Sequence, residues 1–171
     1  GATNHLDRIP MPLVRRFAKV VIVGELDQTQ RVHLLKHFAN FLPVQKGFAK
    51  QAWADCATKL DGAVGDIVRK VVDDLWRAKM TAFVTGHAHE AERLKRWLTK
   101  DGTEKFDLSQ FDEQRRGQFK AKLRPFMEVT PSDVHHSVDG YLDNLAIQAE
   151  IAKCRATYEG ARKVLATLRA A

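Results

Sequence analysis

The stretch from Thr130 to the end of the chain carries an uninterrupted helical pattern. Thr130 suits the N-cap position, Pro131 suits the first helical position, and Asp133 can return a hydrogen bond to the cap. Apolar side chains then recur three or four residues apart, which places them in one stripe along a helix. They are Val134, Val138, Tyr141, Leu145, Ala149 and Ala152. This pattern predicts a long amphipathic helix and, with it, an all-α fold.

A second long pattern follows Asp61, where apolar residues again step by four and three positions. This spacing predicts an apolar seam that packs against a neighbouring helix. The seam consists of Val64, Val68, Val71, Leu75, Ala78 and Ala82 and continues through Phe83, His87, Ala91, Leu94 and Leu98. Gly86 lies where the seam changes line, so a kink is expected there. The C-terminal stripe also drifts, to a line from Ile147 to Leu168, which predicts a new buried face or a bend near Gly160.

The elements at 61–100 and 130–170 match in length, so each is expected to bury its stripe on the other. Shorter helices are expected at 10–24, 26–42, 46–60 and 108–128. We therefore predict an all-α bundle of five or six helices with two long antiparallel helices. Within 10–24, the β-branched run Val20–Val23 makes a strand the alternative. Residues 1–9 are expected to be a flexible N-terminal segment, and residues 10–171 a single helical-bundle domain.

Motifs of the common catalytic classes are missing from the sequence. The patterns GxSxG, GxxxxGK[ST] and GxGxxG do not occur, and the ten glycines are scattered, so no phosphate-cradling loop and no cofactor are predicted. Cys56 and Cys154 lack CxxC spacing and are expected to be small buried side chains, with one interhelical disulfide as the alternative. No apolar run is long enough to cross a bilayer, and no secretory signal is visible, which leaves the compartment open.

A histidine-rich segment provides the candidates for a metal site, namely His87, His89 and Glu90. This segment holds two His-x-x-Glu pairs, whereas di-iron bundles use the reverse order, Glu-x-x-His, on two helices. The HExxH motif is absent, and His87 falls on the apolar line of its helix. We therefore expect structural roles for these side chains and no bound metal.

Cationic residues alternate with phenylalanines in the region 108–128. The candidate polyanion-binding residues are Arg115, Arg116, Lys120, Lys122 and Arg124, with Arg93 and Arg96 in a second, weaker cluster. Arg116, Lys120 and Arg124 are spaced by four and share the polar side of the expected helix, whereas Arg115 and Lys122 fall on its apolar side. Cations beside aromatic rings can hold phosphates while the rings stack on bases. The alternative, which we favour, is that the aliphatic stems of Arg115 and Lys122 cover the edge of the core.

The net charge of +7 is concentrated at the two ends of the chain. Residues 1–50 hold 8 Lys/Arg against 3 Asp/Glu, residues 151–171 hold 5 against 1, and residues 101–150 hold 6 against 10. If the terminal helices pack side by side near the 115–124 cluster, they would build one continuous basic face. Such asymmetry is informative about partners rather than about fold.

Abundant amphipathic helix without a catalytic motif predicts a non-catalytic module that mediates protein–protein interaction, as an adaptor, effector or assembly component. In that case Trp53, Trp76 and Trp97 should not all be buried, because exposed aromatic residues often anchor interfaces. The alternative hypothesis is a basic helical protein that binds nucleic acid or another polyanion. A protein partner is thus expected first, while the oligomeric state is not predicted.

Overall fold

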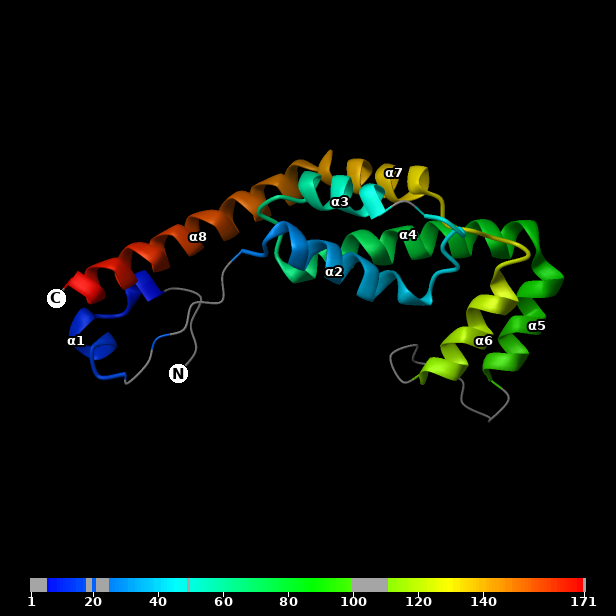
Figure 1. Ribbon diagram of the computed structural model, residues 1–171, viewed down its shortest axis with the longest axis horizontal. Helices are drawn as coiled ribbons and strands as arrows, with labels where there is room; N and C mark the ends of the chain where they lie inside the picture. The colour runs from blue at the N-terminus through cyan, green and yellow to red at the C-terminus, as the bar shows by residue number, and fades with distance from the viewer. Residues whose placement is uncertain (1–5, 18–19, 21–24, 49, 100–110, 171) are drawn as a thin grey trace.

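The computed structural model describes residues 6–17, 20, 25–48, 50–99 and 111–170, and these ranges contain helices and no strands (Figure 1). The elements are η1 (Leu6–Arg8), α1 (Met11–Val14), α2 (Gln28–Phe38), η2 (Ala39–Phe41), α3 (Lys50–Lys59), α4 (Gly65–Gly86), α5 (Ala88–Leu98), α6 (Glu113–Leu123), α7 (Pro131–Leu142) and α8 (Leu145–Ala170), where η marks a 3-10 helix. They form an elongated arch. Its middle is a packed group of helices, and α8 and the α5–α6 pair extend toward opposite ends (Figure 1).

The all-α prediction is confirmed, but the described residues form eight α-helices rather than five or six. Both long elements are divided into two helices, the first of them at the position where a kink was expected. The 61–100 element breaks after Gly86, at His87, whose backbone (φ −139°, ψ 53°) is not helical. The 130–170 element breaks at Asp143 and Asn144 instead of near Gly160, which lies inside α8. Asn144 Oδ1 accepts a hydrogen bond of 2.9 Å from the backbone N–H of Ala146 and so caps the new helix.

The predicted start of α7 is confirmed in detail. Thr130 Oγ1 accepts a hydrogen bond of 3.3 Å from the Asp133 backbone N–H, and Asp133 Oδ2 accepts one of 2.8 Å from the Thr130 backbone N–H. This reciprocal pair is a capping box, and Pro131 follows the cap as expected. The predicted drift of the apolar stripe is also present, because Leu145 is 78% exposed whereas Ile151 is buried. The helix break between these two residues accounts for the change of face.

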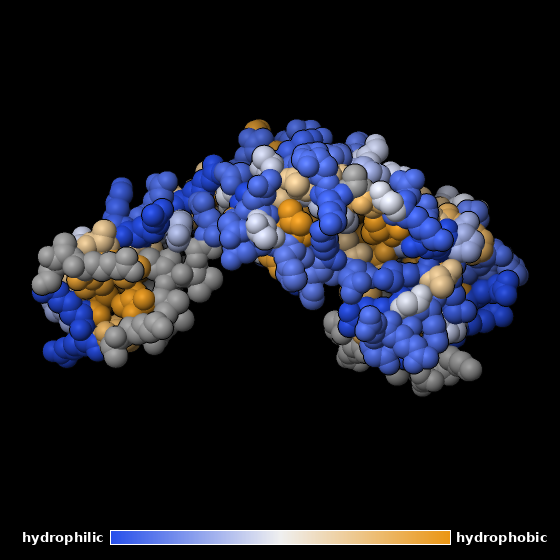
Figure 2. Space-filling model, viewed as in Figure 1, coloured by the Kyte–Doolittle hydropathy of each residue, from blue (hydrophilic) through white to orange (hydrophobic). Residues whose placement is uncertain are grey.

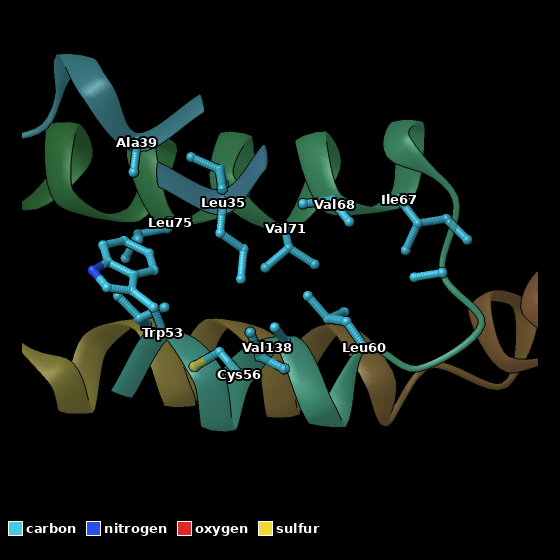
Figure 3. Close-up of a cluster of buried hydrophobic side chains, with 14 of the residues drawn as sticks. Leu35, Ala39, Trp53, Cys56, Leu60, Ile67, Val68, Val71, Leu75 and Val138 are labelled. Atoms are coloured by element: carbon cyan, nitrogen blue, oxygen red, sulfur yellow. The ribbon is translucent and has the colours of Figure 1, made fainter. Parts of the chain in front are cut away.

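The main core lies between α2, α3, α4 and α7 (Figure 3). Its fully buried side chains include Leu35, Cys56, Leu60, Ile67, Val68, Val71 and Val138. The seam predicted for α4 is buried at Val68, Val71 and Leu75, but Ala78 and Ala82 are exposed because this part of α4 turns another face, with Met80 and Phe83, toward α5 and α6. Fully burying an aliphatic side chain contributes roughly 1.5–3 kcal/mol, so this cluster dominates the stability of the central helices.

A second apolar cluster joins the end of α4 to α5 and α6. Its buried members are Phe83, Leu94, Leu98, Phe111, Phe119 and Leu123. Trp76 and Met127 pack against both clusters and therefore connect the α5–α6 end to the main core. The helix α6 begins with an N-cap hydrogen bond of 2.7 Å from the Arg115 backbone N–H to Asp112 Oδ1, and it ends at Leu123, ahead of Pro125.

The remaining helices match the expected segments only in part. The helix expected at 26–42 appears as α2 and η2, and the one expected at 46–60 appears as α3. The segment 10–24 contains only the short α1, while residues 18–19 and 21–24, where a strand was the alternative, lie outside the described residues. Residues 6–8 of the segment expected to be flexible form η1, which packs against α8, and residues 1–5 lie outside the described ranges.

None of the described helices is both long enough and apolar enough to span a membrane.

Candidate functional site

A charged network fixes α8 to the rest of the molecule. The carboxylate of Asp61 lies between two arginines, 3.0 Å from the guanidinium of Arg31 and 2.6 Å from that of Arg155. Arg31 is 5% exposed, and it also donates hydrogen bonds to the backbone carbonyls of Leu26 and Ala57. The network therefore links α2, the α3–α4 turn and α8. No local sequence pattern marks these residues, because they lie far apart along the chain.

The turn that carries this network requires glycine at position 62. Gly62 has φ +77°, a conformation that side-chain-bearing residues rarely adopt. A Cβ atom built at Gly62 would collide with the guanidinium of Arg155. The close contact between Gly62 and the guanidinium of Arg155 thus couples the backbone of the α3–α4 turn to the position of α8.

Beyond this network, α8 extends away from the core and meets the N-terminal elements. We call this region the arm and define it as η1, α1 and residues 156–170 of α8. η1 packs against α8, so the two basic ends of the chain converge as the sequence analysis supposed (Figure 1). The arm carries exposed cations that form no ion pair in the part of the chain that the structure describes. They are Arg8, Arg15, Arg16, Arg162 and Lys163.

The arm also exposes apolar side chains beside these cations. Leu13 is 49% exposed and Phe17 is 46% exposed, while Val14 between them is buried. Apolar surface is visible at this end of the molecule (Figure 2). A mixture of exposed apolar groups and unpaired arginines resembles the composition of protein interfaces more than that of a solvated surface.

The polar side of α6 faces η2 and the linker after it. Arg116 donates a hydrogen bond of 2.7 Å to the Phe111 carbonyl, and its guanidinium lies 5.5 Å from the centre of the Phe41 ring. Arg124 pairs with Glu128 at 2.9 Å and donates a hydrogen bond of 3.2 Å to the Val44 carbonyl. The Arg116, Lys120 and Arg124 stripe therefore contacts the neighbouring helix instead of facing solvent throughout.

Between α2–η2 and α6 lies a cleft of about 340 Å³. Its cationic lining residues are Lys36, Lys120 and Arg124, and its apolar lining includes Leu42, Val44 and Trp53. No carboxylate lines the cleft, and neither Lys36 nor Lys120 forms an ion pair within the described ranges. Two members of the predicted basic stripe are thus brought together with a lysine from α2 that the sequence analysis did not select.

The other cations of α6 lie on its opposite side, around Trp97. The Arg115 guanidinium is 4.7 Å from the centre of the Phe111 ring and 5.9 Å from that of Trp97, and Lys122 Nζ is 5.2 Å from the Trp97 ring. These contacts agree with the interpretation that both stems cover the edge of the core. On α5, Arg93 is exposed, and Arg96 pairs at 3.6 Å with Glu92 one turn earlier.

The predicted continuous basic face does not form. The arm and α6 lie at opposite ends of the arch, separated by the central helices (Figure 1). The hollow between the two ends is visible in the space-filling view (Figure 2). The seven candidate residues on α5 and α6 are therefore separate from the basic termini, and any polyanion would meet two distinct surfaces.

The candidate metal residues do not converge. His87 is exposed and its ring lies 5.2 Å from that of Phe126, while His89 points toward solvent with Nδ1 3.7 Å from Glu90. Within the described residues, no three His, Cys, Asp or Glu side chains are grouped so that they could hold a metal ion. The structure therefore places His87 in an aromatic contact rather than in a ligand set.

Cys56 and His135 form a contact that resembles a nucleophile and its base, with Sγ 3.6 Å from Nδ1. Cys56 is fully buried, however, and this burial raises the pKa of its thiol to about 11. A thiol with such a pKa is protonated at neutral pH and is a poor nucleophile. Both cysteines are free, Cys56 buried as expected and Cys154 half-buried, so the alternative of a disulfide is not realised.

The tryptophans differ in burial. Trp53 is 6% exposed, whereas Trp76 and Trp97 are half-buried. The condition set for an interface anchor, that the three are not all buried, is met.

Comparison of the chain with family models, with curated proteins and with solved structures finds no match. Its function is therefore inferred from the arm, the cleft and the contacts that hold them.

Proposed function

We propose that this chain is a non-catalytic helical module that binds an acidic protein partner through the arm. One observation carries the proposal: α8 leaves the core after Arg155, and the arm presents exposed apolar side chains among cations that form no ion pair with any described residue. Among the described residues, η1 is the element outside α7 that packs most against α8, and the part of α8 beyond Arg155 contributes no buried side chain to the core. A partner would supply the missing burial.

The chemistry of the arm defines the kind of partner. Its five unpaired cations would be repelled by a basic surface and attracted by an acidic one, which favours encounter and orientation. Leu13 and Phe17 supply the apolar contacts, which give most of the affinity when they are desolvated. An acidic surface with a shallow apolar depression therefore fits the arm best.

Site-directed photo-crosslinking in the native cell extract tests the proposal. A benzoylphenylalanine at Leu13, 49% exposed, should capture an acidic protein that the same probe at Val84, 50% exposed on α4, does not capture. The double substitution Arg162→Glu/Lys163→Glu should abolish the capture, whereas the matched change Arg93→Glu/Arg96→Glu on α5 should leave it intact. Identical products from Leu13 and Val84, or capture that survives the charge reversal on α8, would contradict the proposal.

Binding of a nucleic acid or another polyanion is the second candidate, and the same unpaired cations on the arm favour it. If these five cations each neutralised one phosphate, affinity should fall by about 500-fold between about 50 and 200 mM salt. A salt titration against random single- and double-stranded oligonucleotides measures this slope. Loss of binding in Arg162→Glu/Lys163→Glu would assign it to the arm, whereas loss in Arg116→Ala/Lys120→Ala/Arg124→Ala would assign it to α6. No binding at low salt would remove this candidate.

A further inference from the structure

We infer that the cleft between α2–η2 and α6 binds a small amphiphilic anion, in which one carboxylate or phosphate group is joined to a short apolar body. This inference is independent of the arm and of its partner. It combines the charge balance of the cleft, the chemistry of its lining and the way in which its walls are held.

The charge balance favours an anion. Lys36 approaches the cleft from α2, and Lys120 and Arg124 approach it from α6 and its C-cap; among the described residues, Glu128 is the only carboxylate paired with any of the three. Two lysine charges are therefore uncompensated. Cations held near one another repel, and an anionic group between them removes that repulsion while it accepts charged hydrogen bonds.

The lining also contains neutral donors. The indole N–H of Trp53 has no hydrogen-bond partner among the described residues. Because no fully buried side-chain nitrogen there lacks a partner, this N–H keeps some contact with solvent. Trp53 lines the cleft, and so does Asn40, which carries an amide. The lining thus includes two neutral side chains that carry N–H groups in addition to the three cations.

The apolar lining of the cleft favours an amphiphilic ligand over an anion without an apolar group. Among the apolar lining residues, Leu42 and Trp53 are almost fully buried, whereas Val44 is half-buried and is the side chain that an apolar group in the cleft would cover. A volume of about 340 Å³ is near the lower end of the roughly 300–1,000 Å³ typical of ligand pockets. The ligand body is accordingly short.

The walls of the cleft are fixed before any ligand binds. Val44 and Val129 form a parallel bridge, in which the Gln45 N–H donates to the Val129 carbonyl and the Val129 N–H donates to the Pro43 carbonyl, both at 3.0 Å. The guanidinium of Arg124 is held by Glu128 and by the Val44 carbonyl, with further N–H groups available. Because these groups are already ordered, little conformational entropy is lost on binding.

Titration followed by ¹⁵N–¹H NMR tests the inference, since the three tryptophan indole signals report on separate places. Octanoate and octyl phosphate are the probes. We expect at least one of them to shift the Trp53 indole signal saturably while the Trp97 signal stays in place, and the tighter binder identifies the headgroup. Acetate and octanol, which carry only the charge or only the chain, should bind at least tenfold more weakly.

Matched variants locate the binding. Lys36→Gln/Lys120→Gln should weaken the better probe by about tenfold, and Lys120→Gln alone by about threefold. Lys122→Gln is the control, because it removes a lysine of the same helix that lies over Trp97 instead. An unmoved Trp53 signal with both probes, equal affinity for octanol, or equal weakening by Lys122→Gln would each overturn the inference.

Discussion

The central helices and the arm are held in place by different kinds of contact. In the core, Leu35, Leu60 and Val138 are completely enclosed by apolar neighbours from four helices. The arm continues from the start of α8, which is held by the buried Ile151 and by Asp61, whose carboxylate is shared by a buried arginine and a half-exposed one. Apolar burial is non-directional and persists in salt, whereas an ion-pair network depends on geometry and is screened. The arm can therefore be loosened without unfolding the core, as befits a region that engages a partner.

The largest expected effect separates the two regions directly. Leu60→Ala, at a fully buried position, should lower the free energy of unfolding by about 2–5 kcal/mol. Leu165→Ala, at a half-buried position on the arm, should cost about 1 kcal/mol or less. Urea denaturation followed by circular dichroism measures both. Similar losses at the two positions would show that the arm is part of the cooperative core.

Substitution at Gly62 tests the coupling between the turn and the arm. Gly62→Ala strains the backbone at φ +77° by about 1–2 kcal/mol and also displaces the guanidinium of Arg155. Gly47 has the same φ of +77° but open space around it, so Gly47→Ala isolates the backbone strain alone. Only Gly62→Ala should accelerate amide hydrogen exchange in residues 156–170. Equal acceleration in the two variants would mean that Arg155 does not hold the arm.

Removal of the charge at Asp61 gives a smaller effect with a characteristic salt dependence. Asp61→Asn keeps the shape of the side chain but leaves Arg31, 5% exposed, without its counter-charge. Because Asp61 itself is well exposed, the expected loss is about 1–2 kcal/mol, below that for a fully buried pair. Asp139→Asn, which breaks the exposed pair with Lys59, should have a smaller effect than Asp61→Asn, because solvent screens this pair.

Hydrogen exchange distinguishes these two carboxylate variants. Asp61→Asn should release α8, and added salt should release it in the unmodified protein as well. Asp139→Asn should leave hydrogen exchange in α8 unchanged, because the Lys59–Asp139 ion pair joins α3 to α7 and does not involve α8. Protection of α8 that is insensitive to both Asp61→Asn and salt would contradict the proposed role of the network.

The difference between core and arm also separates what the sequence predicts from what it does not. The helical class and the capping box at Thr130 depend on residues a few positions apart, and both were predicted. The break at Asn144 was not predicted, because the helical periodicity of apolar residues continues across it. The drift of the apolar stripe was the one local sign of a change in the helix. Local spacing carries such features because the helix itself fixes which residues share a face.

Features set by distant residues were not predictable in this way. Asp61 and Arg155 are 94 positions apart. The sequence around Asp61 does not distinguish a solvated carboxylate from one that is shared by two arginines. The cleft needs Lys36 beside Lys120, which depends on how α2 and α6 pack. The separation of α6 from the basic ends likewise follows from the overall arch and not from charge counts (Figure 1).

The smallest predicted effect is a pH dependence at the junction of α4 and α7, on the core side of the comparison. Burial alone would raise the pKa of Asp133, but hydrogen bonds from Lys79 and Thr130 more than offset it and lower that pKa below the ordinary value of 3.8. A carboxyl with a depressed folded-state pKa stabilises the fold above the unfolded-state pKa, and this contribution is lost as the pH falls through the folded-state value.

Asp133→Asn should therefore be less stable than the unmodified protein by about 1 kcal/mol at pH 7. Below about pH 4 the difference should shrink in urea titrations, because the unmodified side chain also becomes neutral. The Asp61→Asn variant differs from Asp133→Asn in the region that it affects, since at neutral pH it should accelerate hydrogen exchange in the arm. A difference for Asp133→Asn that stays constant down to pH 2 would show that its role is steric instead of electrostatic.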